Sequence, residues 1–334
     1  MPGAAAAPAA RSGRLRESRM RARAWLGWTI LAVALVAWPL FNDNRFILTM
    51  GTLVAFSAIG ASSLNLIIRT GHVSLAHAAF MGVAAYACVL VQMRLGLSFA
   101  MGLVIGCLAS GLLALILGPI MLRLTGKYFV LVTFLVGEII RMVFVEWGSL
   151  TGGSNGIQGV PSIHPIFDSP IAFYYLALGA AAVCVGIALR ILSSEIGRAI
   201  DSVREAERVA QCSGVPVIQL KVTIFVIACM LVGVQGALQA HFLKFVDPTA
   251  FNIDVSLNLV VMNVIGGMHH LVGPLLGSVF IVSLPELLRG YVELQRVIFG
   301  VILIVVMAAL PAGMVGALAW ARRIIAESFA AKKR

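Results

Sequence analysis

The chain has 334 residues, of which 60% are hydrophobic and 12% are charged, and its mean hydropathy is +0.99. Repeated apolar runs of about 20 residues exceed what a water-soluble core needs and match the length that crosses ~30 Å of hydrocarbon. The net charge of +11 does not indicate nucleic-acid binding, because the basic residues lie between apolar runs and form no face interleaved with aromatic residues. The composition therefore predicts an all-α, polytopic transmembrane helical bundle.

The chain begins with a basic segment, 1–23, followed by an apolar run, 24–41. Its arginines resemble the start of a signal peptide, but no small-residue cleavage site follows in WPLFNDNRF, so we expect a retained first crossing. A second basic segment, 321–334, ends the chain, and we expect a transmembrane domain, 24–320, of about eight to ten membrane segments between two tails. The further apolar runs are 46–68, 75–93, 97–122, 128–147, 171–193, 222–242, a glycine-interrupted run 257–284, and 297–320.

The basic residues are divided unequally between the two sides of the predicted bundle. If the N-terminus is cytoplasmic, 19 of the 25 Lys and Arg residues fall on the cytoplasmic side, five fall on the other side, and Arg141 lies inside a run. This distribution follows the positive-inside rule. We therefore expect both tails, and the charged loop 194–221, to be cytoplasmic.

Nine full crossings would place the C-terminal tail outside, against the same rule. The run 257–284 contains GGMHHLVGPLLG, in which glycines, a proline and the pair His269 and His270 interrupt the apolar pattern. Broken helices at membrane depth occur where protein or a water-filled cavity surrounds them. We expect a re-entrant element of two half-helices here. The alternative is a soft loop between two short crossings.

The stretch SVREAERVAQCSGVP, 202–216, is unusually charged for this chain. A charged residue at the bilayer centre costs ~2.5 to 3.5 kcal/mol on insertion scales, so this stretch lies outside the hydrocarbon. Ser202 and Glu205 have the spacing of a capping box, and Glu205 and Arg208 that of an i,i+3 pair. Gly214 and Pro216 are stop signals, so the pattern predicts a helix of roughly eleven residues.

Such a helix would place small apolar residues, Ala206, Val209 and Ala210, on one side and charges on the other. That arrangement suits docking against a soluble partner. The alternative is a solvated connector on the membrane surface.

The stretch 202–216 resembles the coupling segment of ABC importer permeases, a Glu-Ala-rich helix followed by glycine. Three further stretches, 71–87, 126–161 and 266–289, are similar in the same order to the permease family of branched-chain amino acid ABC transporters, over roughly 45–310. The resemblance implies a type II-like importer permease in a bacterial inner membrane. It assigns contact with the ATPase to Arg204, Glu205, Ala206, Glu207, Ala210 and Gly214.

The resemblance implies two cytoplasmic ATPase subunits, a second and paralogous permease, and a periplasmic solute-binding protein as partners. It implies no cofactor in this chain, with ATP and Mg on the ATPase. The chain contains no G-x-x-x-x-G-K-[ST] motif, so a partner must supply the nucleotide site. Two departures from the family pattern concern the partner and the substrate: Val209-Ala210 replaces Ala-Ala, with Cys212-Ser213 before the glycine, and His269-His270 replaces Gly-Ser.

The implied substrates are branched-chain or other hydrophobic amino acids, although related permeases carry urea, amides or aromatic carboxylates. Two alternatives come from other classes of protein. An ion-coupled secondary transporter would use Glu138 without an ATPase. An intramembrane enzyme would need a catalytic motif, and the chain has neither HExxH nor GxSxG.

Polar residues within the apolar runs are the candidates for a solute path. Glu138 and Arg141 are three residues apart and can form an ion pair, which could serve translocation or only helix packing. Asn65, Ser74 and His77 surround a polar break and could line the path or bond neighbouring helices. For Gln235, Gln239 and His241 in the run 222–242 we expect packing.

The loop 148–170 is expected on the outer side and carries no Lys or Arg. Loops this long are often functional, and a glycine-rich backbone permits close approach. In the resembling family this face receives the binding protein, so Gly152, Gly153, Ser154 and Asn155 are the candidate docking residues. Simple flexibility is the alternative.

Overall fold

The computed structural model describes residues 44–288, 294–310 and 313–317. The expected first crossing, 24–41, and both basic tails lie outside the described residues. Residues 1–49 form one unit and residues 50–334 another. The packing described below is that of the second unit.

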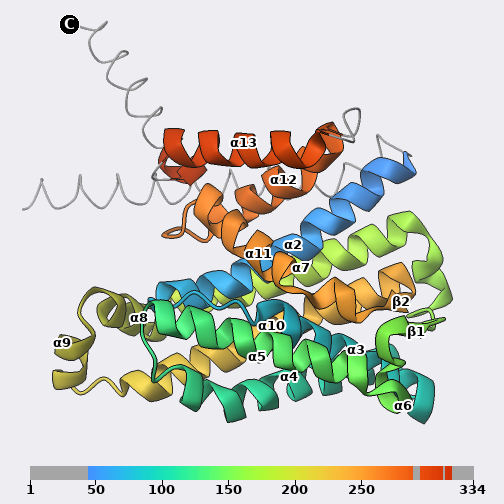
Figure 1. Cartoon of the computed structure of the whole chain (residues 1–334), viewed down its shortest axis with the longest axis horizontal. Coiled ribbons are helices and arrows are strands. Elements are labelled where there is room, and N and C mark those ends of the chain that lie inside the picture. Colours follow the sequence, from blue (N-terminus) through green and yellow to red (C-terminus); the bar gives the residue numbers. More distant parts are fainter. Residues whose placement is uncertain (1–43, 289–293, 311–312, 318–334) are drawn as a thin grey trace, which may run out of the picture. The chain divides into compact units, whose positions relative to one another are not determined.

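The apolar runs from 46–68 to 222–242 form helices whose ends lie within a few residues of the expected ones, whereas α13 (Gln295–Ala309), expected to end at 320, ends at Ala309. Within the described residues, seven helical segments are long and apolar enough to cross a membrane. The expected all-α, polytopic fold is therefore confirmed. The long helices in Figure 1 are α2 (Arg45–Arg69), α3 (His77–Leu95), α4 (Phe99–Met121), α5 (Lys127–Glu146), α7 (Pro170–Leu192) and α10 (Val217–Leu243), followed by α11 (Ile253–Gly266), α12 (Val272–Leu287) and α13 (Gln295–Ala309).

Short elements occupy the connections between the long helices. β1 (Ile157–Gln158) pairs antiparallel with β2 (Phe245–Val246), and Ile157 lies opposite Val246. This two-residue ladder ties the connection between α5 and α7 to the end of α10. The remaining short elements are α6 (Gly148–Thr151), α8 (Glu195–Glu205), α9 (Glu207–Cys212) and the 3-10 turns η1 (Gly153–Asn155), η2 (Pro165–Asp168) and η3 (Pro248–Phe251).

Helices α3, α4 and α10 form the closely packed centre of the bundle. A Cβ atom at Gly236 of α10 would lie 2.2 Å from the carbonyl oxygen of Met81 on α3, and one at Gly106 of α4 would lie 2.5 Å from that of Ala84. Small residues at helix interfaces allow this approach, which supplies much of the attraction between helices in lipid. Close backbone approach at these glycines, together with buried side chains such as Phe80 and Phe225, forms the centre of the bundle.

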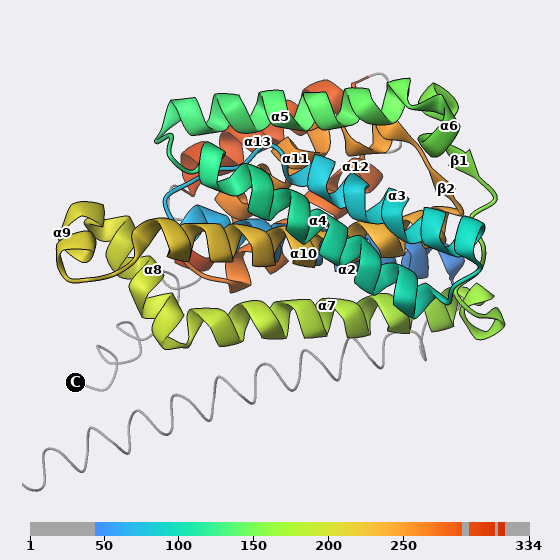
Figure 2. The same ribbon diagram turned by 90° about the horizontal axis from the view of Figure 1, so that it is seen from below.

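The helices run between two ends of different character. α8 and α9 lie at one end, with the connection between α4 and α5, while α6, β1 and β2 lie at the opposite end (Figure 2). The first end carries most of the basic residues of the described connections, including Arg123, Lys127, Arg198 and Arg208. The unequal division of basic residues expected from the sequence is therefore present between the two ends of the bundle.

Candidate functional site

The charged loop 194–221, here called the coupling loop, folds as two helices and not as one. α8 starts at Glu195, where the Ser194 hydroxyl oxygen accepts a hydrogen bond from the backbone N–H of Ile196 at 3.2 Å. Ala206 breaks the helix with φ −153° and ψ 81°, and α9 follows. The expected capping box is wrong, because Ser202 lies inside α8 and its hydroxyl donates to the Ala199 carbonyl at 2.8 Å. The N-cap of the first helix is therefore Ser194 and not Ser202.

The end of α9 follows the predicted stop signals. Gly214 adopts φ +87°, and the N–H of Val215 donates to the Ala210 carbonyl at 3.1 Å. Pro216 then precedes the first residue of α10. These bonds fold α9 back towards α10 and explain why a glycine stands at this position.

A small apolar core holds the coupling loop together. Val203 of α8, Ala210 of α9 and Val217 of α10 are buried against each other. Ala206 and Val209 are exposed, with Val209 at 65%, whereas Ala210 is buried, so the three do not share one face as expected. The outer surface of the loop therefore carries an exposed valine between charged residues.

An ion pair connects α9 to α10. The Lys221 ammonium group donates to the Glu207 carboxylate at 2.7 Å, with the Lys221 side chain 2% exposed and the Glu207 side chain 46% exposed. The expected pair between Glu205 and Arg208 is absent from the described residues, because Ala206 separates the two onto different helices. Glu205 and Arg208 are exposed instead. Of the residues assigned to ATPase contact, Glu207 therefore also has a structural role.

The glycine-interrupted run is a hairpin of two helices, α11 and α12, broken after Gly266. A Cβ atom at Gly266 would lie 1.8 Å from the Gly273 carbonyl oxygen, and one at Gly277 would lie 1.9 Å from that of Met262. These pairs show an antiparallel arrangement that only glycine allows, so the end of α12 returns to the level at which α11 begins. The predicted break is confirmed. Both the re-entrant element and two short crossings have antiparallel arms, so the arrangement fits both expectations.

The turn of this hairpin, 267–271, contacts two other helices. The Asn65 amide of α2 donates to the Met268 carbonyl at 3.1 Å, and the Arg69 guanidinium donates to the His269 carbonyl. The Arg204 guanidinium of α8 lies 2.9 Å from His269 Nδ1. His269 and His270 lie in this turn, and only the side chain of His269 has a hydrogen-bond partner within the described residues.

Two of the three residues of the polar break bond to neighbouring helices. Asn65 donates to the Asn263 side-chain oxygen at 2.9 Å, and His77 Nε2 lies 2.9 Å from the Ser63 hydroxyl. Ser74 is fully buried and its hydroxyl has no partner within the described residues. The three residues are fully buried, so their role in a solute path stays a prediction, while helix bonding by Asn65 and His77 is present.

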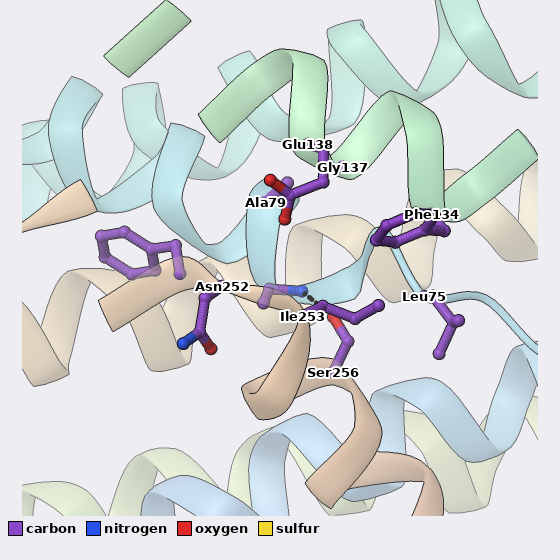
Figure 3. A pocket seen from close by; sticks show the side chains of 10 residues that line it. Leu75, Ala79, Phe134, Gly137, Glu138, Asn252, Ile253 and Ser256 are labelled. Atoms are coloured by element: carbon purple, nitrogen blue, oxygen red, sulfur yellow. Dashed lines mark hydrogen bonds between the residues drawn. The ribbon is translucent and has the colours of Figure 1, made fainter. Parts of the chain in front are cut away.

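Glu138 and Arg141 form the expected pair, with Arg141 Nε donating to Glu138 Oε2 at 2.8 Å. Their side chains are 25% and 27% exposed, although they lie in the middle of α5. Glu138 lines a small pocket between α5, the start of α3 and the η3–α11 connection, and Figure 3 shows its carboxylate pointing towards Ala79. The other lining residues are Leu75, Ala78, Phe134, Gly137, Phe251, Asn252, Ile253 and Ser256.

The glycine-rich part of the outer loop folds as a turn in which three glycines adopt left-handed backbone angles. Gly152, Gly153 and Gly156 adopt φ values of +78°, +63° and +64°. A Cβ atom at Gly156 would lie 2.1 Å from the Val246 carbonyl oxygen of β2. Glycine is therefore required here by the backbone and by packing. Ser154 and Asn155 are exposed at the tip of this turn.

A polar clamp holds the rest of the outer loop to the end of α10. Asp168 accepts hydrogen bonds from the Ser162 hydroxyl at 2.8 Å and from the Lys244 ammonium group at 3.0 Å. These two bonds, the Ser162 bond first, lower the pKa of Asp168. The clamp and the β1–β2 ladder together hold the outer loop, 148–170, against the end of α10.

The polar residues of α10 pack within the bundle, as expected. His241 Nε2 is hydrogen-bonded to the Gln92 side-chain oxygen of α3, and its ring lies edge-on to Phe99 with centroids 4.7 Å apart. Gln235 is 4% exposed, and Gln239 is partly buried.

Sequence reasoning missed four residues that organise the site. Arg69, Asp201, Lys221 and Asn263 take part in the contacts around the coupling loop and the hairpin turn, including an Arg69–Asp201 pair at 3.7 Å. The available signals were two charged residues next to the ends of apolar runs, Arg69 and Lys221, a carboxylate in the charged loop, Asp201, and a polar residue inside a run, Asn263. Their partners are distant in sequence, so the pairing itself had no local signature.

The family model described as "Branched-chain amino acid transport system / permease component" matches residues 46–307. The chain belongs to this family. The match covers every long helix from α2 to α12, including the coupling loop and the hairpin. The permease is therefore a transport component with a multi-pass membrane domain.

Two curated relatives are similar to the permease over 311 residues at 28% identity. Both are described as "High-affinity branched-chain amino acid transport system permease protein LivM", one from Salmonella typhimurium and one from Escherichia coli K12. Each alignment covers 85% of this chain and 73% of the relative. No solved structure matches the permease.

Proposed function

We propose that this permease is the membrane subunit of a bacterial inner-membrane ABC importer for branched-chain amino acids. The family and the two relatives support the transport system and the substrate class. We further propose that two cytoplasmic ATPase subunits bind at the coupling loop, that a paralogous permease completes the membrane domain, and that a periplasmic binding protein docks at the turn 152–155. ATP and Mg belong to the ATPase subunits, and both tails of this chain are cytoplasmic.

The observation that carries the proposal is the construction of the coupling loop. Its own apolar core and the Lys221–Glu207 pair hold it on α10, while Glu205, Arg208 and Val209 remain exposed on its outer surface. An exposed apolar side chain between charged residues is the composition of a protein contact with a polar rim. A loop that served only as a solvated connector would not need a buried lysine to hold it on α10.

The proposal is tested by variants of this outer surface. We expect Val209→Arg combined with Arg208→Glu to abolish copurification of the ATPase subunits and to reduce leucine uptake at least tenfold. Arg198→Glu, on the exposed first half of α8, is the control and should retain both. Uptake that persists in the double variant and follows a proton gradient would instead indicate an ion-coupled carrier.

We also propose that Glu138 and Arg141 border the path of the substrate. The pair is about a quarter exposed in the middle of a membrane span, and a charged pair facing lipid there is costly. The small pocket beside Glu138 has a mixed polar and apolar lining, and it would have to widen during transport to admit an amino acid. Asn65, Ser74 and His77 lie nearer the hairpin end of the bundle and are the further candidates along this path.

Two variants separate a role in the path from one in packing. Glu138→Gln should lower leucine uptake several-fold, whereas Glu146→Gln at the end of α5 should not. Replacing both members, Glu138→Leu with Arg141→Leu, removes the charges but keeps the packing volume. If that double variant transports normally, the pair is structural only.

A further inference from the structure

The turn of the α11–α12 hairpin, 267–271, is exposed at its tip and is bonded to the coupling loop. α8 reaches it directly, through Arg204 and the side chain of His269 at 2.9 Å. A second connection is indirect, because Asp201 of α8 pairs with Arg69 at 3.7 Å and Arg69 donates to the His269 carbonyl. Both connections therefore converge on one residue of the turn.

The direct connection depends on the side chain of His269. A guanidinium group has only donors, so Nδ1 of His269 must be the acceptor and the ring proton lies on Nε2. The other bonds to the turn, from Asn65 and Arg69, end on backbone carbonyl oxygens that any residue supplies. Only His269 contributes a side chain that links the turn to α8 within the described residues.

The hairpin is built to move as one body. Gly266, Gly273 and Gly277 bring its two arms into backbone contact, so the arms cannot slide past each other without a clash. The arms pack closely on each other, and the first arm is also bonded to α2, where Asn263 accepts from Asn65 and donates to the Ala61 carbonyl. Its first arm reaches the small pocket beside Glu138, because Ile253 and Ser256 of α11 line it.

We propose that His269 is the positioning residue that transmits movement of the coupling loop to the α11–α12 hairpin, and through α11 to the pocket at Glu138. This inference rests on the proposed function, since it takes the coupling loop as the contact with the ATPase. When the ATPase subunits move α8, Arg204 carries the turn with it. The hairpin then displaces Ile253 and Ser256 relative to α5.

The test uses the full importer reconstituted with its ATPase subunits and binding protein, and measures leucine uptake and ATP hydrolysis together. We expect His269→Ala to lower the leucine taken up per ATP hydrolysed at least fivefold while the ATPase subunits still copurify. The neighbouring His270→Ala is the matched control and should retain the wild-type ratio. A packing role alone would lower both rates in proportion and leave the ratio unchanged.

Two conservative variants test the accepting atom. The side-chain oxygen of Asn can take the place of Nδ1, so His269→Asn should recover most of the ratio, whereas the longer His269→Gln should not. Arg204→Gln should resemble His269→Ala, and the double variant should be no worse than either single one because the two residues act through one contact.

A wild-type ratio in His269→Ala, or equal losses in His269→Ala and His270→Ala, would overturn the inference while leaving the proposed function intact. Failure of the wild-type chain to bind ATPase subunits would refute the proposed function itself. Thermal unfolding of each variant in detergent identifies any that fails to fold. In that case the comparison of His269→Asn with His269→Gln decides the question.

Discussion

A single buried ammonium group sets the position of α9. The Lys221 side chain is 2% exposed and the Glu207 carboxylate at 2.7 Å is its only ion-pair partner within the described residues. Removing one member of such a pair leaves an uncompensated buried charge, which costs more than the pair itself contributes. Glu207 is half-exposed, which moderates the cost.

We therefore expect Glu207→Ala to reduce the free energy of unfolding by roughly 2 kcal/mol. The double variant Glu207→Ala with Lys221→Met should recover part of this loss, since no buried charge remains. Thermal unfolding in detergent measures both. Glu205→Ala is the control, because Glu205 is exposed, and an equal loss there would contradict this account.

The protonation of His72 links stability to pH. His72 lies in the turn between α2 and α3, is 5% exposed, and its Nδ1 lies 3.0 Å from the Thr70 carbonyl oxygen. Burial lowers the pKa of His72, and the charge of Lys221 lowers it further. The unfolded chain has a histidine pKa of about 6.5, so below this pH the unfolded state binds more protons and the folded state loses stability.

We expect the unfolding temperature to fall between pH 7 and pH 5, and the slope to decrease in His72→Asn, which retains a donor for the Thr70 carbonyl. His164→Asn, at an exposed position in the outer loop, should keep the wild-type slope. An identical slope in both variants would exclude His72 as the source.

At the scale of elements, the glycines of the outer turn constrain its backbone and its packing on β2. Gly156 has φ +64° and faces the Val246 carbonyl oxygen, so a side chain must displace β2 or leave its backbone conformation. Gly156→Ala should cost about 1 to 3 kcal/mol of stability. It should also weaken binding of the periplasmic binding protein, measured on the purified importer.

Gly148→Ala is the matched control for this turn. A Cβ atom at Gly148 meets nothing within 4 Å, so stability and binding should both be retained. If binding protein affinity is unchanged in Gly156→Ala despite a distorted turn, then the docking surface lies elsewhere on this end of the bundle.

The elements divide into those that hydropathy determines and those that local bonds determine. The long helices from α2 to α10 were predicted to within a few residues because lipid demands about 20 apolar residues in each of them. The break at Gly267 was predicted because glycine and proline interrupt an apolar run. The α8–α9 break was not, since Ser202 and Glu205 satisfy the pattern of a helix start although Ser194 is the residue that caps α8.

The contacts of the site were predictable only where both residues lie close together on one helix. Glu138 and Arg141 pair because they are three residues apart on one helix, a spacing that is visible in the sequence. Arg204 and His269 meet across 65 positions, and Asn65 and Asn263 across 198. Such contacts depend on how the helices pack, which neither charge nor hydropathy specifies.

At the scale of the whole molecule, the native cysteines provide a test of orientation. Cys212 in α9 is exposed, whereas Cys88, Cys184 and Cys229 are buried and Cys107 is partly buried. A membrane-impermeant maleimide should label Cys212 in inside-out vesicles but not in intact cells. Cys212→Ser should abolish the labelling, and labelling of intact cells would reverse the proposed topology.

The same approach tests the return of the hairpin. Leu287 at the end of α12 is 79% exposed. In a Cys212→Ser background, Leu287→Cys should be labelled from outside, because α12 ends at the level at which α11 begins. Labelling from the cytoplasm would mean that the antiparallel arms do not return to the outer side.

Helix α10 has a consequence for how this transporter communicates across the bilayer. It begins one residue after the coupling loop's Pro216 and ends next to β2, and its 27 residues extend about 40 Å without an internal proline or break. One continuous helix therefore connects the coupling loop to the outer turn. If the binding protein docks at the outer turn and the ATPase at the coupling loop, as proposed, a tilt of α10 caused by one partner reaches the other through a single helix.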